Sequence, residues 1–322
     1  MRRAAGYFLL ACALAQCASV GRRASVIMTG VASRLSPGDV RIEIKRSFLE
    51  AYKDKVTIQV TFTVDKAAGS INPTSFDGDL HFAGRAPEIG LRLVGEIKNA
   101  AEADSAVAQV RRAESTRRPI QLTGAWRVWA EHSLGRPEQQ DRPLPELETP
   151  HVEHVFEIHP VTRIGGISLL QTLHTNEGYK PGSAERTFGI YQDADFRLRA
   201  TPTTVIFDTP TWLYNDVHFL MEITGSGQKV VADGRFVTGS ALDLDGKLLV
   251  ERLRMVFVEG TAPERAVRSL ERGARLHVWG MPRLNFAEIS RRAAEAGTTS
   301  GFVEGPLPYE ILVLGVYPTT AP

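Results

Sequence analysis

The chain has 322 residues, which is more than one hydrophobic core usually fills, so two domains are expected. Its composition, 43% hydrophobic and 23% charged, is that of an ordinary soluble globular protein. The formal net charge is +1, which is too small to attract nucleic acid or an anionic membrane surface. A nucleic-acid partner is therefore not expected.

The N-terminus has the layout of a secretory signal. Arg2 and Arg3 give a positive start, Tyr7–Ala15 is a short apolar run, and small residues follow at Ala18 and Ser19. The apolar run is far too short to span a bilayer, so it predicts a signal peptide over 1–19 rather than a membrane anchor. The protein is expected to be exported, either periplasmic or secreted. The other interpretation is a buried N-terminal helix.

Both cysteines, Cys12 and Cys17, lie inside this segment or at its end. Cleavage after Cys17 would leave a mature chain without thiols, which excludes disulfides, thiolate metal sites and a cysteine nucleophile. The run Leu14–Cys17 also resembles a bacterial lipoprotein signal, although Gln16 replaces the small residue that this pattern requires. Secretion is favoured over anchoring, and a lipid on Cys17 is the only membrane contact expected.

After an irregular segment over 20–45, the region 46–166 predicts a small β-barrel. Ala100–Arg112 is expected to be a helix that starts from a capping box of Asn99 and Glu102. Gly124 predicts a bulge, and the proline-rich stretch Ser133–Pro150 predicts an exposed loop. Strands are predicted from period-two patterns at Val56–Val64, Leu80–Phe82, Leu91–Ile97, Ile120–Ala130 and within His151–Ile164, the last one closed by Pro160.

The order is three strands, a helix, a strand, a long loop and a strand. An OB-fold, a five-stranded Greek-key barrel, has its helix between the third and fourth strands. The region also carries FDGDLH at Phe76–His81 and EIHP at Glu157–Pro160. In these segments it resembles a group of uncharacterised bacterial exported proteins with an OB-like domain. The resemblance covers about a third of the chain and implies an architecture without an activity.

The second domain, 167–322, is predicted to be rich in β-strands. Capping boxes predict helices over Ala262–Arg272 and from Phe286 to the residue before Gly297. Leu122–Val128 and Val278–Leu284 both follow a helix and share glycine and arginine at matching offsets. This echo predicts a second OB-like barrel, and a generic β-rich domain is the alternative. Further strands are expected at Phe196–Ala200, Thr203–Phe207, Val217–Ile223, Lys229–Phe236, Leu248–Val258, Arg275–Trp279 and Ile311–Val316.

Ionisable residues crowd into the first domain. Five of the eight histidines fall between His81 and His159. Phe156 and Ile158 suit the barrel interior, so Glu157 and His159 are expected on its outer side. The commoner outcome for such residues is a solvated or hydrogen-bonded pair.

A metal centre is the sharper hypothesis. Imidazole and carboxylate groups that converge can hold a divalent metal ion and activate water for hydrolysis. Glu96 or His132 would support the ligands from outside. The candidate ligands are Asp79, His81, Glu157 and His159. Neither HExxH nor another fixed metal-ligand spacing is present, and no P-loop, GxSxG or GxGxxG motif occurs.

A binding function is the leading expectation. Trp129 and Arg127 share one side of a predicted strand and would line a partly aromatic groove beside the proline-rich loop. The candidate binding residues are Arg127, Trp129, His132, Glu157 and His159. We expect an exported, non-catalytic protein that binds a carbohydrate or another envelope protein and needs no cofactor. The alternatives are the metal-assisted hydrolase and a purely structural envelope component.

Overall fold

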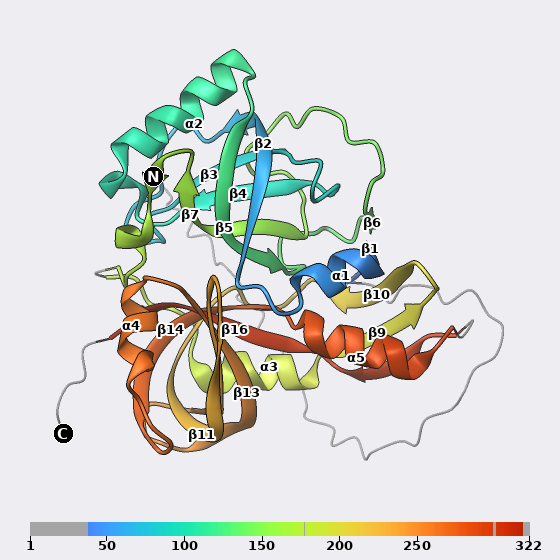
Figure 1. The fold of residues 1–322 in the computed structure, drawn as a ribbon, viewed down its shortest axis with the longest axis vertical. Helices are drawn as coiled ribbons and strands as arrows, with labels where there is room; N and C mark the ends of the chain where they lie inside the picture. Colours follow the sequence, from blue (N-terminus) through green and yellow to red (C-terminus); the bar gives the residue numbers. More distant parts are fainter. Residues whose placement is uncertain (1–37, 177, 299–300, 318–322) are drawn as a thin grey trace, which may run out of the picture.

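The computed structural model describes residues 38–176, 178–298 and 301–317. They form two closed five-stranded barrels and a third sheet that borders both (Figure 1). The predicted signal peptide and both cysteines lie outside the described residues. Within the described part of the chain, no helix is long and apolar enough to cross a membrane.

The first barrel has the strand order of an OB-fold. Its first strand pairs with the second and the fourth, and β4 pairs in parallel with β7 to close the barrel. Leu80, Phe82 and Ile158 point into the core, because alternate side chains of a strand face opposite sides. The strands are β2 (Thr57–Ala67), β3 (Leu80–Arg85), β4 (Leu93–Ile97), β5 (Ile120–Val128) and β7 (Phe156–Ile164).

The second barrel repeats this topology strand for strand. Its third strand pairs in parallel with its fifth, and its first strand pairs with the second and the fourth. The predicted second OB-like barrel is therefore confirmed. The strands are β11 (Val217–Val231), β12 (Gly234–Leu242), β13 (Leu248–Val258), β14 (Arg275–Leu284) and β16 (Tyr309–Val316).

The third sheet is built from segments that flank or interrupt the barrels, in the order β15-β9-β10-β1-β6. Strand β6 lies in the long loop of the first barrel, and β15 lies in the equivalent connection of the second. The sheet therefore ties the two barrels together. Its strands are β1 (Asp39–Lys45), β6 (Glu138–Gln139), β9 (Asp195–Ala200), β10 (Thr204–Pro210) and β15 (Val303–Pro306). The short strand β8 (Ile167–Ser168) belongs to the first barrel, where it pairs antiparallel with the end of β7.

Five α-helices cover the barrels and their shared sheet in the described residues. Thr261 accepts a hydrogen bond from the Glu264 amide and Asn285 from the Glu288 amide, so two predicted caps are confirmed. The helices are α1 (Arg46–Tyr52), α2 (Asp104–Thr116), α3 (Ala184–Asp193), α4 (Ala262–Arg268) and α5 (Phe286–Ala296), with 3₁₀ turns η1 (Ala100–Glu102) and η2 (Leu170–Thr172).

The short sequence echo marks equivalent places in the two barrels. A Cβ on Gly124 would lie 2.4 Å from Ile158 Cγ2, and a Cβ on Gly280 would lie 2.4 Å from Ile311 Cγ2. The strand register is irregular beside both glycines, as the predicted bulge at Gly124 requires. In each barrel the fourth strand therefore bends against the fifth where only glycine fits.

Several local predictions were wrong because tertiary contacts override local pattern. Strand β1 occupies part of the expected irregular segment, since β10 supplies its hydrogen bonds. Strand β7 continues through Pro160 to Ile164 instead of ending at the proline. The predicted strand Lys229–Phe236 is a hairpin that turns between β11 and β12.

Asn99 does not cap a helix. Its side chain instead donates a hydrogen bond to the Thr172 carbonyl at 2.8 Å. The α-helix behind it begins only at Asp104, after the 3₁₀ turn η1. The amide thus fastens the segment after β8 to the barrel, where the sequence pattern predicted a purely local contact.

Replacing Gly124 by alanine tests the bend. The added methyl group would meet Ile158 Cγ2 and the Pro160 carbonyl oxygen, at 2.5 Å. Overpacking of this kind costs about 1–3 kcal/mol, so urea denaturation should show a lower free energy of unfolding. Gly189→Ala in α3 is the control, because a Cβ there meets nothing within 4 Å and should be neutral or stabilising. Equal stability of the two variants would contradict the close approach.

Candidate metal centre between the barrels

The outer face of the first barrel carries a cluster of charged side chains. Alternation along β3, β4 and β7 places them on the side away from the core. All of them are largely buried, because other parts of the chain cover this face. We call them the outer-face cluster: Asp79, His81, Glu96, Lys98, Glu157 and His159.

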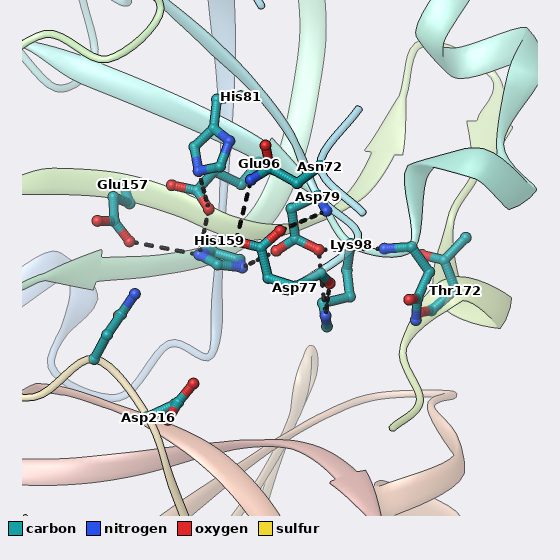
Figure 2. Close-up of polar contacts among 12 residues, drawn as sticks. Asn72, Asp77, Asp79, His81, Glu96, Lys98, Glu157, His159, Thr172 and Asp216 are labelled. Carbon is teal, nitrogen blue, oxygen red and sulfur yellow. Dashed lines mark hydrogen bonds and ion pairs between the residues drawn. The ribbon is translucent and has the colours of Figure 1, made fainter. Parts of the chain in front are cut away.

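His159 lies at the centre of this cluster. Its Nε2 is 3.1 Å from Asp79 Oδ2, and its Nδ1 is 3.0 Å from Glu96 Oε2 and 3.6 Å from Glu157 Oε2 (Figure 2). The imidazole is only 5% exposed, yet neither ring nitrogen is aligned with any described acceptor for a hydrogen bond. Three carboxylates thus surround a buried imidazole at ion-pair distance.

Glu96 joins the two imidazoles of the cluster. The same oxygen, Oε2, lies 3.2 Å from His81 Nε2 and 3.0 Å from His159 Nδ1. Burial disfavours the charged imidazole of His81, but the Glu96 carboxylate outweighs burial and raises the pKa of His81 to about 9. The same balance, with Asp79 and Glu157 added, raises the pKa of His159 well above its ordinary value.

Burial alone would raise the pKa of the Glu96 carboxyl. The imidazoles of His159 and His81 outweigh burial and hold this pKa well below its usual range. The protein therefore favours two positive charges next to the Glu96 carboxylate. Two protonated imidazoles supply them, and one divalent cation bound to neutral imidazoles would supply the same charge.

Lys98 closes the far end of the cluster. Its Nζ lies 3.2 Å from Asp79 Oδ1 and donates to the Asp77 carbonyl at 2.6 Å. The ammonium also lies 4.4 Å from the ring centroid of Trp279 in β14 of the second barrel. Asp79 is thus held by Lys98 through one oxygen, while its other oxygen faces His159.

Arg127 and Glu157 form an ion pair at 2.5 Å that belongs to the contact between the barrels. The Arg127 Nε donates to the Pro282 carbonyl at 2.8 Å. In the second barrel, Arg283 pairs with Glu310 at 2.7 Å, and its Nη1 donates to the Trp126 carbonyl at 3.0 Å. Each arginine therefore donates to the carbonyl of the residue just before the arginine of the other barrel.

The second barrel shows what this face looks like without the cluster. When the two barrels are aligned on Arg127 and Arg283, Phe236 occupies the position equivalent to His81, and Val256 the position equivalent to Glu96. Leu312 occupies the position equivalent to His159. Phe236, Val256 and Leu312 belong to one buried apolar cluster. The fold therefore accepts apolar side chains at these positions, and the arginine–glutamate pair is the part that both barrels share.

Three segments cover the outer-face cluster. The long loop is fixed by the buried Arg92–Glu138 pair and by Leu147, which packs in an apolar cluster with Val94. Residues 169–176 follow β8 and bind the Asp77 carbonyl through Asn176. The second barrel supplies Trp279. The prediction that this loop is exposed is therefore wrong in part, because the loop has buried residues of its own and covers residues of the barrel.

A second group of ionisable residues lies where the long loop meets β7. His154 Nε2 is 3.1 Å from Glu157 Oε1, and His132 Nε2 is 3.9 Å from the same oxygen. The side chain of His132 is 40% exposed, in contrast to the buried outer-face cluster. Although 40% of the His132 side chain is exposed, the surrounding protein desolvates its ring and lowers its pKa to about 4. Burial raises the pKa of the neighbouring Glu131 carboxyl to about 8.

The predicted metal ligands are only partly brought together. Asp79 and His159 converge with Glu96, a residue expected to act from outside the ligand set. His81 reaches this group through Glu96. Glu157 lies in the second group with His132 and His154. His154 and Lys98 were missed, although the histidine spacing before Pro160 was a signal for His154.

The predicted binding groove is different in the structure. Trp129 is 2% exposed and donates through Nε1 to the Tyr214 carbonyl at 3.0 Å. Arg127 is 1% exposed and lies in the contact between barrels. The second half of the chain covers both side chains, so neither presents a surface to an external ligand.

No family model matches this chain, and no curated protein matches it either. One solved structure, described as "Structural mimicry for functional antagonism", aligns over 86% of this chain and 92% of its own. Its sequence identity is 9% and its TM-score is 0.17. A TM-score this low carries no argument about fold or function.

Exchanging the cluster for its counterparts tests its contribution to stability. Replacing a buried ionic network by apolar residues is often neutral or stabilising by about 1–4 kcal/mol. The triple variant His81→Phe, Glu96→Val, His159→Leu should therefore have a free energy of unfolding at least as high as that of the unmodified protein. Urea denaturation in the presence of EDTA measures this. The free energy of unfolding of Glu96→Val alone should be lower by about 3–5 kcal/mol, because this change removes the carboxylate and leaves its two imidazole partners buried. If the triple variant were as unstable as Glu96→Val, the cluster would be required for folding, which would contradict this prediction.

Proposed function

We propose that this chain is an exported protein that binds a divalent first-row metal ion between its two barrels. The ligands are Asp79, Glu96 and His159, and His81 adjoins them through Glu96. The proposal develops the metal hypothesis drawn from the sequence, with Glu96 in place of His81 and Glu157. Export is proposed from the positive, apolar and small-residue order of the N-terminus alone.

The convergence of carboxylates on the buried imidazole of His159 is the observation that carries this proposal. Asp79 Oδ2 lies 3.1 Å from Nε2, and Glu96 Oε2 lies 3.0 Å from Nδ1. An imidazole binds one ion through one nitrogen, so the other nitrogen would donate to the carboxylate on its own side. One ligand atom each from Asp79, Glu96 and His159 lies within 4.8 Å of the others.

Charge and chemistry support the same conclusion. A divalent cation can replace the two protons that His81 and His159 otherwise hold next to Glu96, so the charge balance of the buried site is kept. One imidazole and two carboxylates suit zinc or manganese better than calcium, which takes oxygen ligands only. The second barrel has apolar residues at the equivalent positions of His81, Glu96 and His159, which argues that they serve more than folding.

The enclosure of the centre favours binding over catalysis. Catalytic zinc sites keep one coordination position open to water or substrate, whereas structural sites are closed. Asp79, Glu96 and His159 are each at most 5% exposed. The expected carbohydrate or protein ligand stays a prediction, and Arg127 and Trp129 would have to be uncovered before they could contact one.

Metal analysis of the purified protein tests the proposal. Protein prepared without added metal, or dialysed against Zn²⁺ and then gel-filtered, should contain zinc or manganese by mass spectrometry. Removing the metal with EDTA should lower the melting temperature, and Zn²⁺ should restore it, since a ligand that binds only the native state stabilises it. Glu96→Gln should weaken Zn²⁺ binding at least tenfold in calorimetry.

His218→Gln is the matched control, because His218 lies in the second barrel, outside both groups. It should bind Zn²⁺ as the unmodified protein does. A protein that stays metal-free after Zn²⁺ dialysis, with an unchanged melting temperature, would contradict the proposal.

A further inference from the structure

The second group, His132, His154 and Glu157, offers two imidazoles and one carboxylate from a single corner of the first barrel. Glu157 lies on β7, His154 lies two residues before that strand, and His132 lies in the long loop that precedes it. The three ligand atoms lie within 4.8 Å of one another. This set is distinct from Asp79, Glu96 and His159, and the two sets share no residue.

The ring of His154 is oriented for a ligand at Nε2. Its Nδ1 lies 2.7 Å from the Val152 carbonyl, which can only accept, so Nδ1 carries a hydrogen and donates it. In a neutral ring Nε2 then presents its lone pair to Glu157 Oε1, at 3.1 Å. Either a proton or a metal ion between these two atoms would join them, and the 3.1 Å contact places both atoms at one point. A backbone carbonyl that fixes one imidazole nitrogen is also the usual support for a metal-binding histidine.

His132 completes the set from the solvent side. Its ring stacks on that of His154 with centroids 5.0 Å apart, and its Nε2 is directed to the same carboxylate oxygen of Glu157. Glu131 Oε1 lies 3.3 Å from this nitrogen. Because the His132 side chain is 40% exposed, the group is reached by water, unlike the enclosed centre.

Glu157 can serve this group without giving up its partner in the barrel contact. Its Oε2 pairs with Arg127, while its Oε1 faces the two histidines. The carboxylate is therefore neutralised on one side only. It is held in place by Arg127, so the oxygen that faces the histidines is positioned before any ligand arrives.

We propose that His132, His154 and Glu157 hold a second divalent metal ion that keeps at least one exchangeable water. Two histidines and one carboxylate with an open position are the ligand set of hydrolytic zinc sites and of non-haem iron sites. A small anion is the class of ligand that would displace the water. If the protein has a hydrolytic activity, this open site is where water is activated, and the enclosed centre is not.

Cobalt substitution tests the second site directly. Metal-free protein titrated with Co²⁺ should take up two ions per chain, and azide should change the visible absorption of one of them. His132→Gln should weaken binding of that ion at least tenfold and abolish the azide response, with the other ion retained. His151→Gln is the matched control, because His151 is an exposed histidine of the same loop outside the group.

The two proposals fail differently in this experiment. Glu96→Gln should remove the azide-insensitive ion and leave the azide response in place, so its outcome bears on the enclosed centre alone. Circular dichroism and melting temperature establish that each variant is folded. A His132→Gln protein that binds Co²⁺ and responds to azide as the unmodified protein does would overturn the second site. An azide response lost equally in His151→Gln would overturn it as well.

Discussion

The two barrels are held against each other by a reciprocal pair of buried arginines. Arg127 donates to the Pro282 carbonyl, and Arg283 donates to the Trp126 carbonyl. A buried guanidinium is costly unless its hydrogen-bond donors are used and its charge is balanced. Glu157 and Glu310 balance the charge across the same strand pair in each barrel. Each barrel supplies a carbonyl acceptor for the buried arginine of the other barrel, so each arginine needs both barrels to complete its hydrogen bonds.

This shared contact separates structural charges from functional ones. The arginine–glutamate pair recurs in both barrels, so it belongs to the architecture. His81, Glu96 and His159 have Phe236, Val256 and Leu312 as their counterparts in the second barrel, where these three form part of an apolar cluster. Burying ionisable groups costs free energy that apolar side chains would not cost. The retention of this cluster in one copy of a repeated fold is the reason for proposing a ligand there.

The covering segments divide the ionisable residues into a closed and an open set. Asp79, Glu96 and His159 lie beneath the long loop, the segment after β8 and the second barrel. His132 lies where the loop turns outward and keeps part of its side chain in water. Glu157 stands between the two sets, with one carboxylate oxygen directed to each. The difference in solvent access, more than the difference in ligand type, distinguishes the proposed enclosed ion from the proposed exchangeable one.

The sequence by itself predicted most of the barrel strands, the helices α2, α4 and α5 and the OB-like order of the first half, because period-two alternation and capping residues are local signals. It offered the second barrel as one of two alternatives, and it did not predict α1, α3 or the short strands of the shared sheet. It also placed Glu157 and His159 on the outer side of their strand. Only the tertiary structure decided that this side is buried, since the loop, the segment after β8 and Trp279 of the second barrel come from distant parts of the chain. It likewise decided that Glu96, rather than His81, meets His159, because strand register sets which side chains converge and no local pattern specifies that register.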